Sequence, residues 1–535
     1  MFSYFKTRKK VLFIAVLFFL IQLPFLDQLS LLRGERDILL TGWSLAHTAR
    51  DLYGKLLPLE FTGIDPNVPF VPMYVTALWW LFVPVKSVFL SRLFFVLLST
   101  SVPFLIYEII NFIKKDEKIA LITATIFCFS PGIFYLSRLA LEIGVAFPLL
   151  LAGILCYLKE KKIPSFVFFF LSFFSYHGFR PLIPFLLIYL ELFFNIKGEK
   201  KRMIPNIGLI LFFSITLLLL SLKIDGNLMK SRSSDLIFMN FTQLANQIDY
   251  RRNTSIAPKA VAALFDNKIT ALGMYIKDNF FGGISLEYLF RNGDPSSLYA
   301  TTFSGQFFLT FIILFILGFV QLGKHGKRHD VYILGLILVG LIPSLANVSY
   351  PSYSIRAMLS TVGFSYLFAM GYVYLEFLFG LISNKKKLIK YAFISIIGVS
   401  LFAELGYFGY NFYFRRVRTM SQMYFETERM LPNYLNSSDK PYTIYTSSPR
   451  DMFFGYIFFN STVKANVVQE VMKKGEPYLH ENYAFEKCTQ SMVKTKVIIS
   501  DICLDEIQYA KMSGSQVKKM GYTDYSFRNA FFIVD

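Results

Sequence analysis

The chain has 535 residues, of which 54% are hydrophobic and 18% aromatic, and its formal net charge is +19. This composition excludes an ordinary soluble globular domain. The sequence contains no Walker loop, dinucleotide-binding fingerprint or zinc-ligand spacing, which argues against nucleotide-dependent and zinc-dependent chemistry. The positive charge lies largely in short loops between apolar runs, a pattern typical of membrane orientation and not of nucleic-acid binding.

Short basic clusters separate the apolar runs along the chain. They occupy residues 6–10, 114–118, 159–162, 197–202, 324–329 and 385–387. Lys and Arg gather in the cytoplasmic loops of membrane proteins, so these clusters predict a multi-pass membrane protein and mark its cytoplasmic face. The segments predicted on the opposite side of the membrane are 27–68, 132–142, 176–180, 224–303 and 347–356.

The first apolar run begins at Val11, directly after a basic cluster. No small-residue cleavage site follows it, so the run predicts a retained span with a cytoplasmic N-terminus and not a signal peptide. The next run, 69–85, carries three prolines and a Trp-Trp pair. If it crossed the membrane, the cluster at 114–118 would lie outside, so we predict a juxtamembrane helix here.

The remaining runs predict about eleven spans, several of them shorter than the ~20 residues of a perpendicular membrane helix. The predicted spans are 11–26, 88–112, 119–135, 143–158, 163–175, 180–196, 204–222, 305–322, 331–347, 357–381 and 388–410. They form a predicted membrane domain over residues 1–413, with a first outer loop at 27–87 and a large outer loop at 224–303.

Beyond residue 413 the chain becomes more polar. Strand patterns occur at 442–445, 497–500 and 530–534. We therefore predict a small extracytoplasmic α/β domain over 414–535. It contains Cys488 and Cys503, for which a disulfide and two separate thiols both agree with the sequence.

The first outer loop opens with a charged cluster at residues 33–37. Carboxylates just past a membrane span are placed to accept a proton from a substrate at the membrane surface, or to hold a cation there. Glu35 and Asp37 are therefore the candidate catalytic residues. The sequence also allows a solvated loop in which both carboxylates pair with neighbouring arginines. Further candidate substrate-binding residues in this loop are Arg50 and Asp51.

Three other outer segments each carry one arginine near the start or end of an apolar run. These candidate donor-binding residues, with their polar neighbours, are Arg138, Glu142, His177, Arg180 and Arg356. Taken singly, each arginine is also explained by a helical ion pair or by snorkelling at a helix end. Together they predict a phosphate pocket at the bilayer surface, because a guanidinium can clamp two phosphate oxygens.

The order and spacing of these residues resemble the bacterial family 39 glycosyltransferases, relatives of the protein O-mannosyltransferases and the aminoarabinose transferases. Glu35 matches the Glu of that family's Asp-Glu pair. The run that follows the pair matches at Thr48, Arg50, Asp51, Gly54 and 57–59. Later elements match at Ser130, Pro131, Ser137, Arg138, Glu142, Tyr176, Arg180 and Pro184, and at 265–268, 289–294 and 354–356.

The resemblance implies a mainly α fold, a membrane helical bundle of the GT-C type with a small α/β domain outside. It also implies an inverting, mannosyltransferase-like enzyme in the cell membrane that transfers a sugar from a polyprenyl-phosphate donor to an acceptor hydroxyl of a protein, lipid or glycan. In that scheme the arginines hold the donor phosphate and a first-loop carboxylate deprotonates the acceptor. No cofactor is expected, although a divalent cation at Glu35 and Asp37 is left open.

The sequence departs from the family pattern at two places. Gly34 stands where the family has the Asp taken as catalytic, and 67–69 replaces a Lys-Pro-Pro element. Either Glu35, the first choice, or Asp37 then serves as the base, or activity is altered or lost. The alternatives are a catalytically degenerate scaffold or receptor and a transporter or flippase. The sequence shows no pair of broken helices in two halves, which a transporter would more often have.

Overall fold

The computed structural model describes residues 2–61, 69–196, 203–224, 241–296, 298–301, 303–345, 347, 352–381, 387–420, 424–435, 440–488, 497–500, 503, 517–521 and 529–534. Contacts divide the chain into two compact units. The helical unit consists of Met1–Gln22, Val96–Arg138 and Ile143–Phe408. The mixed unit consists of Leu23–Phe95, Leu139–Glu142 and Gly409–Asp535. The basic clusters predicted at 197–202 and 385–386 and residues 67–68 lie outside the described residues.

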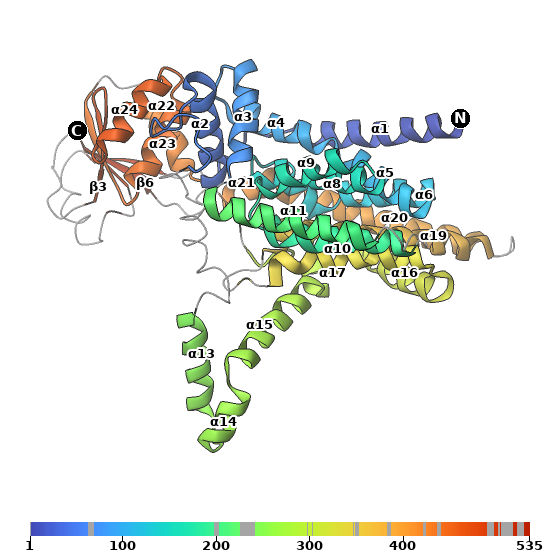
Figure 1. Ribbon diagram of the computed structural model, residues 1–535. Helices are drawn as coiled ribbons and strands as arrows, with labels where there is room; N and C mark the ends of the chain where they lie inside the picture. Colours follow the sequence, from blue (N-terminus) through green and yellow to red (C-terminus); the bar gives the residue numbers. More distant parts are fainter. Residues whose placement is uncertain are drawn as a thin grey trace. The chain divides into compact units, whose positions relative to one another are not determined.

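The helical unit consists of helices, many of which lie side by side (Figure 1). Its elements are α1 (Phe2–Gln22), α5 (Val102–Lys114), α6 (Glu117–Cys128), α7 (Pro131–Leu136), α8 (Glu142–Leu158), α9 (Lys162–Phe173), α10 (Phe179–Ile196), α11 (Met203–Ile224), α13 (Phe241–Thr254), α14 (Lys259–Phe265), α15 (Lys268–Gly283), η3 (Glu287–Arg291), η4 (Leu309–Phe311), α16 (Ile312–His325), α17 (Arg328–Leu345), α18 (Tyr353–Arg356), α19 (Met358–Leu381) and α20 (Lys387–Tyr410). A further helix, α4 (Val88–Ser99), begins in the mixed unit and ends in the helical unit, and α8 and α20 each have one or two end residues in the mixed unit.

Within the described residues, five helical stretches are long and apolar enough to cross a membrane. They are Val88–Lys114, Asn206–Ile224, Arg328–Leu345, Met358–Leu381 and Lys390–Thr419. Shorter apolar helices are Phe70–Phe82, Glu142–Leu158, Lys162–Phe173 and Leu309–His325. The chain is therefore a mainly helical membrane protein. The number of about eleven spans and the orientation of the termini stay predictions.

Close backbone contacts join α16 and α19. A Cβ at Gly318 would overlap the carbonyl of Leu367, and one at Gly371 would overlap the carbonyl of Leu314. Glycine allows the two helices to approach closely, which gives the van der Waals contact that holds apolar helices together in a membrane. An aromatic cluster beside them ties η3 and the segment after it to α19 through Phe290, Phe307, Phe364 and Phe368.

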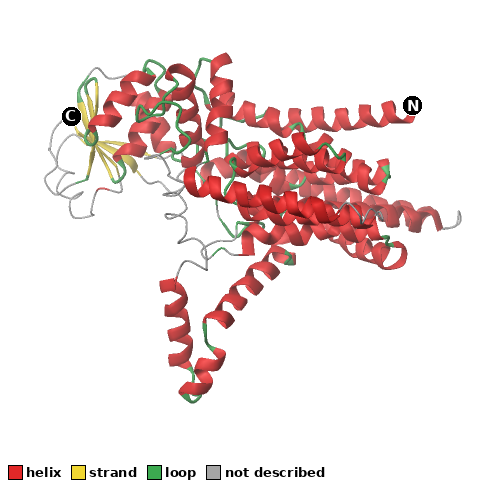
Figure 2. Cartoon of the chain, in the orientation of Figure 1, coloured by secondary structure: helices red, strands yellow, loops and turns green. Residues whose placement is uncertain are grey.

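The mixed unit combines first-loop helices with a six-stranded sheet near the C-terminus (Figure 2). Its elements are α2 (Arg33–Thr48), α3 (Phe70–Phe82), η6 (Asn411–Arg415), α21 (Arg416–Thr419), α22 (Glu426–Leu435), β1 (Tyr442–Thr446), α23 (Pro449–Phe459), α24 (Ala465–Lys474), β2 (Tyr478–His480), β3 (Tyr483–Lys487), β4 (Val497–Ser500), β5 (Val517–Gly521) and β6 (Asn529–Val534). The strands predicted at 442–445, 497–500 and 530–534 are confirmed as β1, β4 and β6.

The sheet has the strand order β2-β3-β1-β4-β6-β5. β1 pairs in parallel with β3 and β4, and the other neighbours are antiparallel. Val497, Ile498 and Ile499 of β4 are all fully buried, the continuous apolar run of a strand that is covered on both faces. Cys488, after β3, forms a disulfide with Cys503, beyond β4, which answers the question that the sequence left open.

The first outer loop folds as part of the mixed unit. α2 packs against α3, α23 and α24. The contact division therefore groups residues 23–95 with 409–535, whereas the predicted domain boundary at 413 separates them. α3 has 13 residues. Such a helix is about 20 Å long, but α9, a predicted span, is shorter still with 12 residues, so the juxtamembrane assignment of α3 stays a prediction.

Candidate functional site

The two candidate catalytic carboxylates lie in the first turns of α2. The helix begins at Arg33, and the backbone N–H of Leu32 donates to Glu35 Oε2 at 2.9 Å. This bond satisfies one of the backbone groups that a helix start would otherwise leave without a partner. Glu35 is 0% exposed and Asp37 is 1% exposed. Neither carboxylate belongs to a solvated loop.

Glu35 is held by Arg92 and by two backbone N–H groups. Arg92 Nε donates to Oε1 at 2.9 Å and its Nη2 donates to Oε2 at 2.7 Å. The backbone N–H of Ala140 also donates to Oε1, at 2.8 Å. Since Arg92 is itself 4% exposed, this is a buried bidentate ion pair. Glu35 thus connects α2, α4 and the 139–142 segment, all within the mixed unit.

Asp37 belongs to a second buried cluster, centred on Arg36. Arg36 Nε and Nη2 donate to Asp37 Oδ1 at 3.2 and 3.1 Å. The same guanidinium pairs with Glu428 of α22, and its Nη2 lies 3.0 Å from Asp451 Oδ1 of α23. Its Nη1 also donates to the Asp451 carbonyl oxygen at 2.9 Å. One buried arginine therefore meets three carboxylates.

Among the carboxyl groups around Arg36, Glu428 has a raised pKa. Burial raises the pKa of Glu428 to about 7, and the nearby Asp451 and Asp37 add to the effect against the opposing pull of Arg36. Burial acts in the same direction on Asp451, but Arg36 and Arg33 outweigh it and hold the pKa of Asp451 below its usual value. The cluster therefore has one carboxyl group that changes protonation near neutral pH.

Gly34 is half-buried, in contrast to its two acidic neighbours. A Cβ built at this position would meet only Leu141 Cδ2 at 3.6 Å, which is an ordinary van der Waals contact. A side chain is therefore sterically acceptable where the resemblance places the catalytic Asp.

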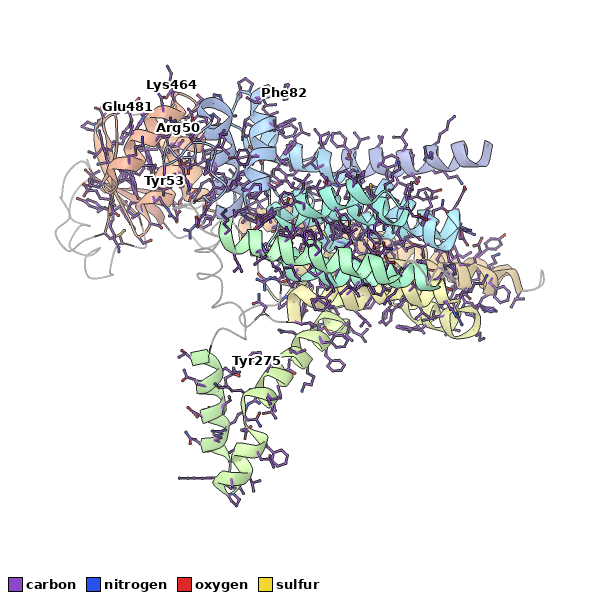
Figure 3. All side chains as sticks on the ribbon, in the orientation of Figure 1. Arg50, Tyr53, Phe82, Tyr275, Lys464 and Glu481 are labelled. Atoms are coloured by element: carbon purple, nitrogen blue, oxygen red, sulfur yellow. A yellow bond between two sulfur atoms is a disulfide. The ribbon has the colours of Figure 1, made fainter. Side chains whose placement is uncertain are left out.

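Arg50 and Asp51 organise the loop that follows α2. Figure 3 labels Arg50 and Tyr53 of this loop. Asp51 Oδ1 accepts the backbone N–H groups of Tyr53 and Lys55 at 3.0 and 2.8 Å. Arg50 Nη1 donates to the carbonyl of Gly54 at 2.8 Å, and Gly54 has a φ of +85°, which glycine adopts readily. Burial raises the pKa of Asp51 against these hydrogen bonds. Both residues thus shape the loop backbone.

The three candidate arginines all lie in the helical unit. Arg138 follows α7, Arg180 lies in the first turn of α10, and Arg356 ends α18. Arg138 and Arg180 are 6% and 7% exposed. The guanidinium of Arg138 lies 5.6 Å from the ring centre of Phe134, and that of Arg180 lies 5.7 Å from that of Phe173.

Contacts between short helices bring two of these arginines to neighbouring elements. α18, which ends at Arg356, packs against α7, which precedes Arg138. α18 also packs against α17, and α17 packs against α10, which carries Arg180. The arrangement therefore joins the three positions through a continuous set of helix contacts.

Asp294 fixes the turn that carries Arg356. Its Oδ2 accepts the backbone N–H of Ser354 at 2.6 Å, and its Oδ1 accepts that of Ser296 at 2.8 Å. Burial raises the pKa of Asp294, whereas the hydrogen bonds from Ser354 and Ser296 and the charge of Arg356 oppose that rise. Asp294 lies in a matched motif at 289–294, but the sequence assigned it no role.

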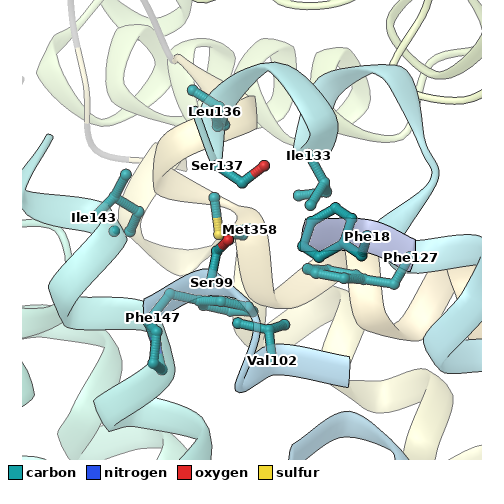
Figure 4. Close-up of a pocket in the computed structure, with 12 residues that line it drawn as sticks. Phe18, Ser99, Val102, Phe127, Ile133, Leu136, Ser137, Ile143, Phe147 and Met358 are labelled. Atoms are coloured by element: carbon teal, nitrogen blue, oxygen red, sulfur yellow. The ribbon is translucent and has the colours of Figure 1, made fainter. Parts of the chain in front are cut away.

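An apolar cavity lies beside two of the arginine positions (Figure 4). Its enclosed volume is about 30 Å³, and its walls come from α1 and from 99–148. Its lining also includes Ser137, which precedes Arg138, and Met358, two residues after Arg356. Most of the other lining residues are apolar, among them Phe18, Phe127 and Phe147.

The remaining candidate residues are His177 and Glu142. His177 lies in the turn between α9 and α10, where its carbonyl accepts the backbone N–H of Arg180 at 3.1 Å. Glu142 begins α8 and belongs to the mixed unit. Among the described residues, no group of three or more His, Cys, Asp and Glu side chains could hold a metal ion.

The sequence did not single out Arg92, Glu428, Asp451 or Asp294. For Arg92 a signal exists, because one arginine inside the apolar run 88–112 requires a partner. For Glu428 and Asp451 no local signal exists, since their partner Arg36 lies 392 and 415 residues away.

No protein-family model matches the chain, and no curated protein matches it in sequence. Among solved structures, the chain is similar to the archaeal oligosaccharyltransferase AglB from Archaeoglobus fulgidus, in complex with an inhibitory peptide and a dolichol-phosphate. The TM-score is 0.42 and the sequence identity is 10%, over 86% of this chain. The chain spans 64% of the length of that protein.

Proposed function

We propose that the chain is a membrane glycosyltransferase of the GT-C type that takes a sugar from a polyprenyl-phosphate donor and passes it to an acceptor hydroxyl. The observation that carries the proposal is the apolar cavity whose lining reaches Ser137 and Met358, beside the positions of Arg138 and Arg356. A donor of this class joins an apolar chain to a phosphate. It therefore needs an apolar cleft next to fixed cations.

In the proposed reaction, the acceptor oxygen attacks the anomeric carbon while the bond from that carbon to the phosphate oxygen breaks. The bonding electrons leave with the polyprenyl phosphate, and the acceptor proton passes to a carboxylate. Arg138, Arg180 and Arg356 stabilise the charge that develops on the phosphate. Attack opposite the leaving group inverts the anomeric centre.

Of the two first-loop carboxylates, Asp37 is the better base. Both oxygens of Glu35 accept hydrogen bonds, from Arg92, Leu32 and Ala140, at 2.7–2.9 Å. A carboxylate whose lone pairs are used in this way is a poor proton acceptor. Asp37 accepts hydrogen bonds from two nitrogens of Arg36 at 3.1 and 3.2 Å, and we take it as the candidate base. In this proposal Glu35 has a structural role, because its hydrogen bonds hold α2 in place.

Purified protein incubated with radiolabelled polyprenyl-phosphate sugars tests the proposal. We expect transfer to an added acceptor, or slow hydrolysis of the donor when no acceptor is present. Nucleotide sugars should not replace the lipid donor, and parallel reactions with a chelator would reveal any need for a divalent cation. A protein that neither binds nor turns over any polyprenyl-phosphate sugar would contradict the assignment.

A second candidate function is donor binding without transfer, as in a scaffold or receptor. Two observations favour it: Gly34 replaces the acidic residue of the related family, and both neighbouring carboxylates are buried in ion pairs. In this case the wild type should bind the labelled donor and release no sugar from it.

The substitution Gly34→Asp separates the two functions. Only Leu141 lies near the added Cβ, and an acidic residue in the first turn of α2 also suits the helix dipole. A scaffold should gain transfer activity, whereas an enzyme that uses Asp37 should already be active and change little. Gly34→Asn, which has the same shape and no charge, is the matched control.

A further inference from the structure

A second cavity of the helical unit lies among α1, α5 and the end of α8. Its volume is about 300 Å³, and it is lined by Arg8, Val11, Phe104, Tyr107, Glu108 and Lys159. The cavity shares none of these residues with the apolar cavity beside Ser137 and Met358. Nothing in the proposed transfer reaction uses it.

Two cations in this cavity share one carboxylate. Lys159 Nζ lies 2.9 Å from Glu108 Oε2, and Arg8 Nη2 lies 3.4 Å from Oε1. The three side chains are between 23% and 50% exposed, so their polar ends can be reached from outside. The local charge is +1, and exposed Lys9, Lys10 and Lys161 flank the same helix ends. The cavity therefore favours an anion.

The wall opposite these charges is apolar. Val11 and Tyr107 are 1% and 3% exposed, and Phe104 completes the lining. Beyond Val11, the outward face of α1 continues with exposed Leu12, Phe13 and Val16. A ligand whose charged group sits between Arg8 and Lys159 could thus lay an apolar chain along α1.

We propose that this cavity binds the phosphate headgroup of an anionic phospholipid. Arg8 and Lys159 contact the phosphate oxygens, and an acyl chain lies on the exposed apolar face of α1. Free phosphate shares the charge of the headgroup but gains nothing from the apolar face. Glu108 competes with the phosphate for both cations and so limits the affinity.

Native mass spectrometry of the full-length protein in detergent, titrated with phosphatidylglycerol or phosphatidylcholine, tests the proposal. We expect phosphatidylglycerol to bind and phosphatidylcholine to bind at least about tenfold more weakly, since only the first carries a net charge. The double variant Arg8→Gln/Lys159→Gln should lose about tenfold or more in affinity for phosphatidylglycerol. Glu108→Gln should bind phosphatidylglycerol more tightly than the wild type.

The matched control is Lys10→Gln/Lys161→Gln, which removes the same charge from the same helix ends without touching the cavity lining. It should keep wild-type affinity within about twofold, because long-range attraction alone is screened by salt. An equal loss in the control and the cavity variant would overturn the proposal. Equal binding of the two lipids, or displacement of phosphatidylglycerol by millimolar inorganic phosphate, would also overturn it. A thermal melt of each variant checks that it is folded.

Discussion

Buried arginines in the two units have different neighbours. In the mixed unit, Arg36 and Arg92 are buried against carboxylates, so their charge is neutralised inside the unit and holds its segments together. In the helical unit, the guanidiniums of Arg138 and Arg180 lie over aromatic rings at positions close to helix ends. A charged residue near a membrane is therefore not evidence of a substrate site until its partners are known.

The comparison predicts two kinds of loss on substitution. Arginines that are paired inside the mixed unit should matter for folding. Arginines that cluster in the helical unit should matter for donor binding. The predictions below test this division, from the largest expected effect to the smallest.

The largest effect is expected from Arg92→Leu, which leaves Glu35 charged and buried without its bidentate partner. Breaking such a pair costs about 3–5 kcal/mol. Chemical denaturation of the purified protein would measure the loss. Glu35→Gln/Arg92→Leu should recover part of it, because no unpaired charge remains. If Arg92→Leu leaves stability unchanged and abolishes only donor turnover, the division between the units is wrong.

The next effect concerns the helical-unit arginines. Each of Arg138→Gln, Arg180→Gln and Arg356→Gln removes a charge-assisted hydrogen bond to phosphate, worth about 1.5–3 kcal/mol. Donor affinity should therefore fall by roughly tenfold or more. Equilibrium binding of a labelled polyprenyl-phosphate sugar is the measurement. Arg418→Gln, at the exposed end of α21, is a control that should retain wild-type affinity. If all three variants bound the donor as tightly as the wild type, the proposed phosphate pocket would be wrong.

The choice of base gives a third prediction. Asp37→Asn keeps the shape of the side chain but cannot accept a proton, so turnover should drop by about 10²-fold while donor binding persists. Glu35→Gln should act mainly on stability. Single-turnover rates, compared at temperatures where both variants are folded, distinguish the roles. Full activity in Asp37→Asn with a large rate loss in Glu35→Gln would restore Glu35 as the base.

Asp294 should act on donor binding through Arg356. Asp294→Asn weakens the two bonds that fix Ser354 and Ser296, an effect of about 1 kcal/mol. We expect KM for the donor to rise severalfold with kcat little changed. In the background of Arg356→Gln the same substitution should have almost no further effect on KM, because the position it fixes no longer binds phosphate. Additive losses in that double variant would show that Asp294 only supports the fold.

The smallest effect is a pH dependence of stability. The pKa of Glu428 is about 7 in the folded protein, above its usual value near 4.5, so the folded state binds a proton more tightly than the unfolded state. Its contribution to stability is full below about pH 4.5 and is lost as the pH rises towards 7. Glu428→Gln should remove this part of the pH profile. If the stability of the wild type rose between about pH 4.5 and 7 relative to that of Glu428→Gln, the predicted direction would be wrong.

Local composition predicted the five long apolar helical stretches and three of the strands, because hydropathy and strand patterns are properties of neighbouring residues. The roles of Glu35 and Asp37 could not be predicted in this way. Residues 33–37 have the same charges whether they form a solvated loop or a buried helix, and only the partners distinguish the two. Glu428 and Asp451 reach Arg36 only in the folded protein. The same is true of Arg92 and Glu35.

The grouping of residues 23–95 with 409–535 has a consequence for how the protein is made. Arg36 emerges from the ribosome 392 residues before its partner Glu428. At usual rates of synthesis this delay is about 20–80 s. During that interval Arg36 has neither Glu428 nor Asp451 as a partner. The first loop should therefore remain sensitive to protease until the C-terminal segment arrives, and nascent chains that stop before residue 426 should be degraded.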